Sequence, residues 1–397
     1  MISSKRNSKA LYIDTEALST LALVQEGLLA PVTGLMNEAT AREVDSKKVY
    51  KGVPFPFSFI LAPTGRRNRE VLETLEEGES VDLVSQGSKV GELKVEEVFE
   101  IDPSERLQHI YGTSDPSHPG VRNTLARLGD IAVSGEYRVN YPLIGDTVNR
   151  VNQMIRRTGA KRIASMMLAA NPINRAHERM IRQSISEADI MVLFLRKPFT
   201  DEGLRYDIRL NALNLFIDNF LPRNRVIVVP FENSYIFAGY NELILDALLA
   251  RNYGCNELII GRNHAGLGLY YDQNRLNSIF DRLSDIDIEI KTVDEYVYCD
   301  TCRTLVSTRT CPHGQHHHIH YHSHSIMTLI QNGILPPTIL VRKEISANII
   351  AALFPNRFEH LQELYYSLMP SSGLLEKKSD EQFYKKLMML YQTSSLT

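Results

Sequence analysis

A regular alternation of apolar and amphipathic segments, from about residue 145 to residue 262, constrains the fold of this chain more than any other feature. Short apolar runs, typical of buried strands, lie at residues 162–170, 189–196, 225–231 and 257–262. Amphipathic segments that we expect to be helices lie before and between them, at residues 146–159, 171–188, 206–221 and 241–254. This alternation predicts βαβ units and an α/β fold with a parallel sheet. Such sheets bind ligands in the loops that follow their strands, here residues 171–178, 196–209 and 262–268.

The segments on either side of this region follow other patterns. Three stretches before it read as strands joined by Gly- and Ser-containing turns, at residues 53–63, 79–101 and 130–143. Residues 18–35 predict one helix and a loop, and the Pro- and Gly-containing residues 114–123 predict a loop. We therefore expect a β-rich N-terminal domain at 1–140, the α/β domain at 141–290, a metal-binding subdomain at 291–355 and a helical tail at 356–397.

The composition and charge of the chain exclude some functions. The formal net charge of -3 lacks the basic excess of a general nucleic-acid-binding protein. No apolar run approaches the roughly 20 residues of a membrane span, and the N-terminal residues lack the apolar core of a secretory signal. We therefore expect a cytoplasmic protein that binds neither nucleic acid nor a membrane.

The loop at residues 171–178 follows an expected strand and opens an expected helix. The N–H groups at the start of a helix favour an anion such as phosphate, and Asn174, Arg175 and His177 add further donors. The alternative is structural: Asn171 or Asn174 caps the helix, and His177 is a packed helix residue.

The loop at residues 261–268 occupies the equivalent position after a later strand. Its three glycines allow the backbone to approach a ligand closely, and Arg262 offers a planar group suited to sulfate or phosphate. A tight turn uses the same residues, so a purely structural role is the alternative. Four basic residues at 196–209 either assist an anion or form a solvated face: Arg196, Lys197, Arg205 and Arg209.

A cluster of cysteines and histidines lies beyond the α/β region. Cys299, Cys302 and Cys311 are three of the chain's four cysteines, and a run of histidines follows them. This spacing predicts a structural zinc site with three thiolates and one imidazole in a reducing compartment. We expect His316 as the fourth ligand, with His313 and His317 as alternatives.

Five blocks of this sequence, in order, resemble motifs of the ATP sulfurylases (sulfate adenylyltransferases). They are GLLAPVTGLMNEATAREV, NPINRAHE, AGYNEL with RNYGCNELIIGRNHAGLG, YCDTCRTLVSTRTCPHG and NGILPPTILVRKEIS. The resemblance runs from about Gly27 to Ser346. It implies a PUA-like N-terminal domain, a Rossmann-like nucleotidyltransferase domain and a small zinc-containing C-terminal part.

The resemblance also implies a reaction and its residues. In the family, a sulfate oxygen attacks the α-phosphorus of MgATP, which gives adenylyl sulfate and pyrophosphate. It implies catalytic roles for Asn174, Arg175 and His177, nucleotide binding by Asn171, Gly261, Asn263 and His264, and sulfate or acceptor contacts from Arg262 and Ala265. Family members are commonly homo-oligomers, so we expect one here.

The sequence departs from the family pattern at the acceptor site. Leu168 and Ala170 stand where the family has the Gln and Arg that hold sulfate, Asn174 replaces a His, and Asn263 replaces an Asp. Loss of that Gln and Arg is expected to weaken sulfate binding by about 3–6 kcal/mol. The sequence therefore leaves three functions open: sulfate adenylyl transfer, adenylyl transfer to a larger or less charged acceptor, and nucleotide binding without catalysis.

Overall fold

The computed structural model describes residues 9–196, 203–231, 239–261, 281–369 and 376–392 of the 397-residue chain. The chain divides into two compact units. The first comprises residues 1–167, 189–200 and 229–292, and the second comprises residues 168–188, 201–228 and 293–397. Within the described ranges, every helix is too short or too polar to cross a lipid bilayer.

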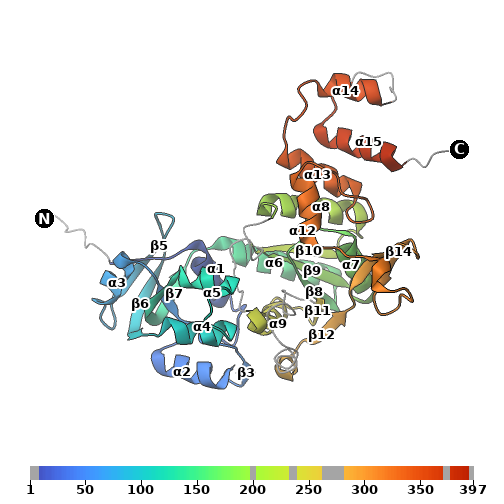
Figure 1. The fold of residues 1–397 in the computed structure, drawn as a ribbon. Coiled ribbons are helices and arrows are strands. Elements are labelled where there is room, and N and C mark those ends of the chain that lie inside the picture. Colours follow the sequence, from blue (N-terminus) through green and yellow to red (C-terminus); the bar gives the residue numbers. More distant parts are fainter. Residues whose placement is uncertain (1–8, 197–202, 232–238, 262–280, 370–375, 393–397) are drawn as a thin grey trace. The chain divides into compact units, whose positions relative to one another are not determined.

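The N-terminal part of the first unit is built on a mainly antiparallel five-stranded sheet (Figure 1). Its strands, in spatial order, are β1 (Ala10–Tyr12), β5 (Ser80–Ser85), β6 (Ser88–Glu100), β7 (Leu128–Val139) and β4 (Leu61–Pro63). Only the β1–β5 pair is parallel among those whose register is known. Alternate residues point to the core, as Leu93 and Val95 of β6 do. The β-rich domain predicted for this region is therefore confirmed.

Helices are more frequent in this part than the sequence patterns indicated. They are α1 (Thr15–Gln25), α2 (Glu38–Lys47), α3 (Arg66–Leu72), α4 (Pro103–Tyr111) and α5 (Pro119–Leu125), beside a short hairpin of β2 (Val49–Tyr50) and β3 (Val53–Pro54). The loop predicted at 114–123 is wrong in its second half, because α5 begins there. Pro119 fits the first turn of a helix, and the His118 ring accepts a hydrogen bond from the Gly120 N–H.

The second sheet carries the strands that were predicted from the apolar runs. Its spatial order is β10 (Val226–Phe231), β9 (Ile190–Arg196), β8 (Ile163–Leu168), β11 (Glu257–Gly261) and β12 (Glu289–Val293). Counted along the chain from β8, the order is third, second, first, fourth and fifth, so the direction of progression reverses between β8 and β11. β8 and β11 are parallel neighbours, with Ala164 opposite Glu257 and Met166 opposite Ile259. In the first unit, α6 (Pro142–Thr158) and α9 (Glu242–Asn252) accompany these strands.

The second unit contains the remaining helices and a small sheet. Helices α7 (Arg175–Glu187) and α8 (Tyr206–Phe220) lie in it, together with α12 (Ser323–Gln331), α13 (Lys343–Leu353), α14 (Leu361–Leu368) and α15 (Asp380–Gln392). A three-stranded antiparallel sheet has the order β14 (Thr304–Ser307), β13 (Tyr296–Cys299) and β15 (His318–Ile319). Helix α15 of the tail packs against α13 (Figure 1). Tyr365, Met369 and Phe383 form a small core there.

Candidate functional site

The three predicted catalytic residues, Asn174, Arg175 and His177, lie at the N-terminal end of α7. Asn174 is the N-cap of α7, and its side chain accepts a hydrogen bond from the His177 N–H at 3.0 Å. In return, the His177 ring Nδ1 accepts from the Asn174 N–H at 3.3 Å. This reciprocal pair is a capping box, so Asn174 caps the helix as the structural alternative expected. A capping role and a catalytic role are compatible, because only one ring nitrogen of His177 is used.

Burial controls the charge state of His177. Desolvation lowers the pKa of this imidazole to about 4, so it is neutral at neutral pH. Because Nδ1 accepts a hydrogen bond, the proton of the neutral ring is on Nε2. His177 can therefore donate one hydrogen bond to a ligand without contributing a positive charge.

Asn171 and Arg209 connect this turn to the start of α8. The Asn171 side-chain oxygen accepts from the Leu204 N–H at 2.9 Å, and a Cβ on Gly203 would come within 2.5 Å of the Asn171 amide nitrogen. Arg209 donates to the carbonyl oxygens of Ala169 and Leu204. Its exposed fraction is only 1 %, so the solvated-face alternative for the basic residues is wrong for Arg209.

The two positions at which the family has its sulfate-holding Gln and Arg are apolar and buried in this chain. Leu168 is 4 % exposed and Ala170 is 1 % exposed, whereas Ala169 between them is exposed. Ala170 has a φ of 47°, in the left-handed region that costs an L-residue about 1 kcal/mol or more. The hydrogen bond from Arg209 to the Ala169 carbonyl is one of the contacts that hold this turn.

Sequence reasoning missed Glu178 as a central residue of the site. Its carboxylate accepts hydrogen bonds from Arg342 at 2.6 and 2.8 Å, from Arg182 at 2.9 Å and from Arg175 at 3.0 Å. Burial raises the pKa of Glu178, but the hydrogen bonds from Arg342 and Arg182 and the charge of Arg342 outweigh it and bring the pKa to about 2. Arg342 also stacks on the Phe220 ring, with 3.9 Å between its guanidinium carbon and the ring centroid.

Arg175 is held by its neighbours at both its backbone and its side chain. Its N–H donates to the Leu340 carbonyl, and its side-chain Nε donates to the Thr338 carbonyl at 3.1 Å. Together with Glu178, these bonds fix residues 338–342 to the first turn of α7. The arrangement was not detectable in the sequence, because Glu178 and Arg342 are 164 positions apart.

Of the second predicted loop, residues 261–268, the structure describes only Gly261. Gly261 ends β11, whereas Arg262, Asn263, His264 and Ala265 lie outside the described residues, as does Lys197. Because β8 and β11 are parallel neighbours, the chain leaves both strands at the same edge of the sheet. That edge, where the strand order reverses, is the position at which open α/β sheets bind ligands.

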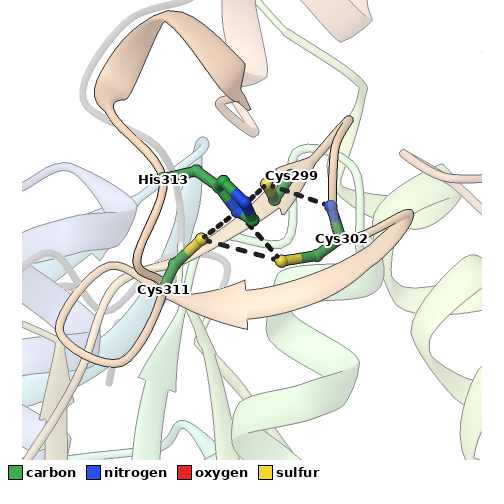
Figure 2. A group of neighbouring side chains, drawn as sticks. All are labelled: Cys299, Cys302, Cys311 and His313. Carbon is green, nitrogen blue, oxygen red and sulfur yellow. Dashed lines mark hydrogen bonds between the residues drawn. The ribbon is translucent and has the colours of Figure 1, made fainter.

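The three clustered cysteines and one histidine form a possible metal centre (Figure 2). Cys299 ends β13, Cys302 follows in the next turn, and Cys311 and His313 lie between β14 and β15. The distances from the His313 Nδ1 to the three Sγ atoms are 3.4, 3.2 and 3.6 Å, and Cys302 Sγ lies 3.9 Å from Cys311 Sγ. Ligands around a tetrahedral zinc would be separated by about 3.8 Å (S to S) and about 3.6 Å (S to N). The four residues therefore fit zinc.

The thiols of this cluster influence one another's ionisation. Burial, followed by hydrogen bonds to Cys299 and Cys311, raises the pKa of the Cys302 thiol to about 11. Sulfurs this close cannot all ionise at neutral pH unless a cation offsets their charge.

The histidine in this cluster is His313, which was an alternative, and not His316, which was preferred; that expectation is corrected. The His316 ring folds back toward Gly314, whose added Cβ would meet it at 2.8 Å, and it lies 4.2 Å from the His317 ring.

These features place the chain in a known class of protein. A β-rich domain is followed by a sheet whose strand order reverses beside a polar strand-to-helix turn, an arrangement of nucleotide-binding α/β proteins. The chain belongs to the ATP-sulfurylase family: the model of that family matches residues 144–352, and a PUA-like domain model matches residues 1–140.

Individual relatives agree with this assignment. A sulfate adenylyltransferase from Chloroflexus aurantiacus is 30% identical over 353 residues, which cover 86% of this chain and 91% of the relative. One from Symbiobacterium thermophilum is 28% identical over 359 residues, covering 88% and 90%. Among solved structures, a hexameric APS kinase from Thiobacillus denitrificans has a TM-score of 0.65 and 19% identity. The match covers 88% of this chain but only 64% of that protein, and it supports the fold alone.

Proposed function

We propose that this protein is an ATP-dependent adenylyltransferase that converts MgATP and sulfate to adenylyl sulfate and pyrophosphate, or runs the reverse reaction. A sulfate oxygen forms a bond to the α-phosphorus as the bond to the pyrophosphate oxygen breaks. The observation that carries the proposal is the polar turn after β8, at the edge where the strand order reverses. Such a transfer depends mainly on positioning and on stabilising charge in the transition state.

The turn after β8 supplies the residues proposed to act on the nucleotide. His177 donates its Nε2–H to a phosphate oxygen, and Asn174 holds that ring in place through the capping box. Arg175 contributes positive charge, which the carboxylate of Glu178 offsets in part. Asn171 and Gly261 are proposed to bind the nucleotide with Asn263 and His264, and Arg262 and Ala265 to contact the acceptor. Magnesium enters bound to ATP and shields the charge of the phosphates.

The acceptor side of the site favours sulfate through Arg209. Its buried guanidinium donates to the Ala169 carbonyl, so a positive charge lies beside the turn that lacks the family's Gln and Arg. The apolar Leu168 and Ala170 favour a second candidate, in which the acceptor is larger or less charged than sulfate. Both candidates use the same nucleotide residues.

Release of pyrophosphate from MgATP distinguishes these candidates. The assay is run with sulfate, with molybdate and with no acceptor. Release that requires sulfate or molybdate supports sulfate adenylyl transfer, and release only with an organic acceptor supports the second candidate. ATP binding without release under any condition overturns both and leaves a nucleotide-binding protein.

A matched pair of variants links the activity to the turn. His177→Asn removes the Nε2 donor and is expected to lower kcat by about 100-fold, a size typical of one hydrogen-bond donor to the transition state. His360→Asn, at an exposed position before α14, is the control and is expected to leave kcat unchanged.

The cluster of Cys299, Cys302, Cys311 and His313 is proposed to hold one structural zinc ion. Four protein ligands leave no open position for a substrate, so the metal would stabilise the small sheet rather than take part in catalysis. We also propose a homo-oligomer, which light scattering during size-exclusion chromatography would detect.

A further inference from the structure

A run of histidines remains unexplained by the proposed zinc site. Residues 316–324 contain six histidines in nine positions: His316, His317, His318, His320, His322 and His324. The zinc cluster uses only His313, which precedes this run.

Just beyond the small sheet, one of these histidines lies beside a carboxylate and a second stacks on it. β15 pairs antiparallel with β13, so that Ile319 lies opposite Tyr298 and His318 opposite Cys299. The pairing ends at Ile319, and His320 and His322 follow it in the short stretch that leads to α12. Alternate residues of an extended chain share one face, and the His320 and His322 rings accordingly stack with 5.4 Å between centroids and 25° between planes.

Glu295 completes a set of possible metal ligands. Its carboxylate Oε1 lies 3.4 Å from the His320 Nδ1. The side chains of Glu295 and His320 are 41% and 32% exposed, and His322 is also exposed. Ions from the solvent can therefore reach all three.

We propose that His320, His322 and Glu295 form a second metal site, which binds an exchangeable divalent transition-metal ion such as Zn²⁺, Co²⁺, Ni²⁺ or Cu²⁺. Two imidazoles and a carboxylate suit these ions, whereas Mg²⁺ and Ca²⁺ prefer oxygen ligands throughout. Forming the site requires these partly exposed side chains to rotate, and such rotation is fast. Water occupies the remaining positions, so this ion exchanges more readily than one held by three thiolates.

Cobalt binding to the untagged, zinc-loaded, full-length protein tests this site. After equilibrium dialysis against Co²⁺, metal analysis is expected to find one zinc and one additional cobalt per chain. The bound cobalt should lack the intense near-ultraviolet charge-transfer band of a cobalt thiolate. Such a band would show that cobalt had replaced zinc at the cysteines, and it would count against the second site.

Two variants locate the site. In the double variant His320→Ala, His322→Ala, the affinity for cobalt is expected to fall by about tenfold or more, while the zinc content and far-ultraviolet circular dichroism stay unchanged. The control His324→Ala lies in the same run, outside the proposed ligand set, and should bind cobalt as the unaltered protein does. Equal binding by the double variant, or an equal loss in the control, would overturn the proposal. Adenylyl transfer is not measured, so failure here leaves the proposed activity untouched.

Discussion

Replacing Glu178 by glutamine removes the one negative charge that joins three arginines at the start of α7. Glu178→Gln preserves the shape of the side chain but leaves Arg342, Arg182 and Arg175 without their ionised acceptor. The carboxyl pKa falls from 4.5 to about 2 in the folded protein. At about 1.4 kcal/mol per pKa unit, the ionised form contributes about 3 kcal/mol to the free energy of unfolding. Removing one partner of a buried ion pair has a comparable cost of about 3–5 kcal/mol.

The pH dependence gives this prediction its sharpest test. Because the folded-state pKa is depressed, the stabilisation is fully present above about pH 4.5 and is lost as the pH falls toward 2. Urea denaturation at pH 7 should therefore give a difference of about 3 kcal/mol between the unaltered protein and Glu178→Gln, and roughly half of that at pH 3.

An exposed carboxylate on another helix provides the matched control. Glu43→Gln removes an exposed carboxylate from an i,i+4 pair with Lys47 and is expected to cause no measurable change at either pH. A difference at pH 7 below about 1 kcal/mol for Glu178→Gln, or one that stays constant down to pH 3, would refute the assigned role of these ion pairs.

Three further predictions concern the capping box and the metal cluster. Asn174→Ala is expected to lower the free energy of unfolding by about 1 kcal/mol, whereas Asn174→Asp keeps a capping oxygen and should not; equal losses would contradict the cap. The His177 pKa of about 4 lies below its ordinary 6.5, so its stabilisation is present above pH 6.5 and is lost toward pH 4. The stability advantage over His177→Asn, followed by denaturation across this range, should shrink accordingly, and a constant advantage would argue against a half-buried neutral ring. Cys302→Ser should lower zinc content and melting temperature together, and metal analysis that finds no zinc in the unaltered protein would remove the site.

The α/β region was predictable because its strands are buried and therefore almost wholly apolar. Residues of β9 such as Val192, Leu193 and Phe194 have no exposed surface, which leaves a continuous hydrophobic signal in the sequence. The N-terminal helices were harder to predict because several are short. Helix α5 has seven residues, and its Pro- and Gly-containing start has the composition of a turn.

The contacts around the candidate site could not be predicted because they join distant parts of the chain. Glu178 and Arg342 read as ordinary surface charges, and only folding shows that they neutralise one another at a buried position. In the sequence, Arg205 and Arg209 both looked like residues of a solvated face. In the structure Arg209 is buried, whereas Arg205 pairs with Asp207 at the surface. Sequence spacing also allowed several histidines as the fourth zinc ligand, and the ring positions distinguish them.

Because Gly203 lies so close to Asn171, the residue types that can stand at these two positions depend on each other. A methyl group at residue 203 would lie 2.5 Å from the Asn171 amide nitrogen, while the oxygen of that amide is already hydrogen-bonded to Leu204. Any side chain at 203 therefore requires a smaller or rotated residue at 171. Across descendants of this chain the two sites should accordingly mutate as a pair, although they lie in separate loops of the sequence.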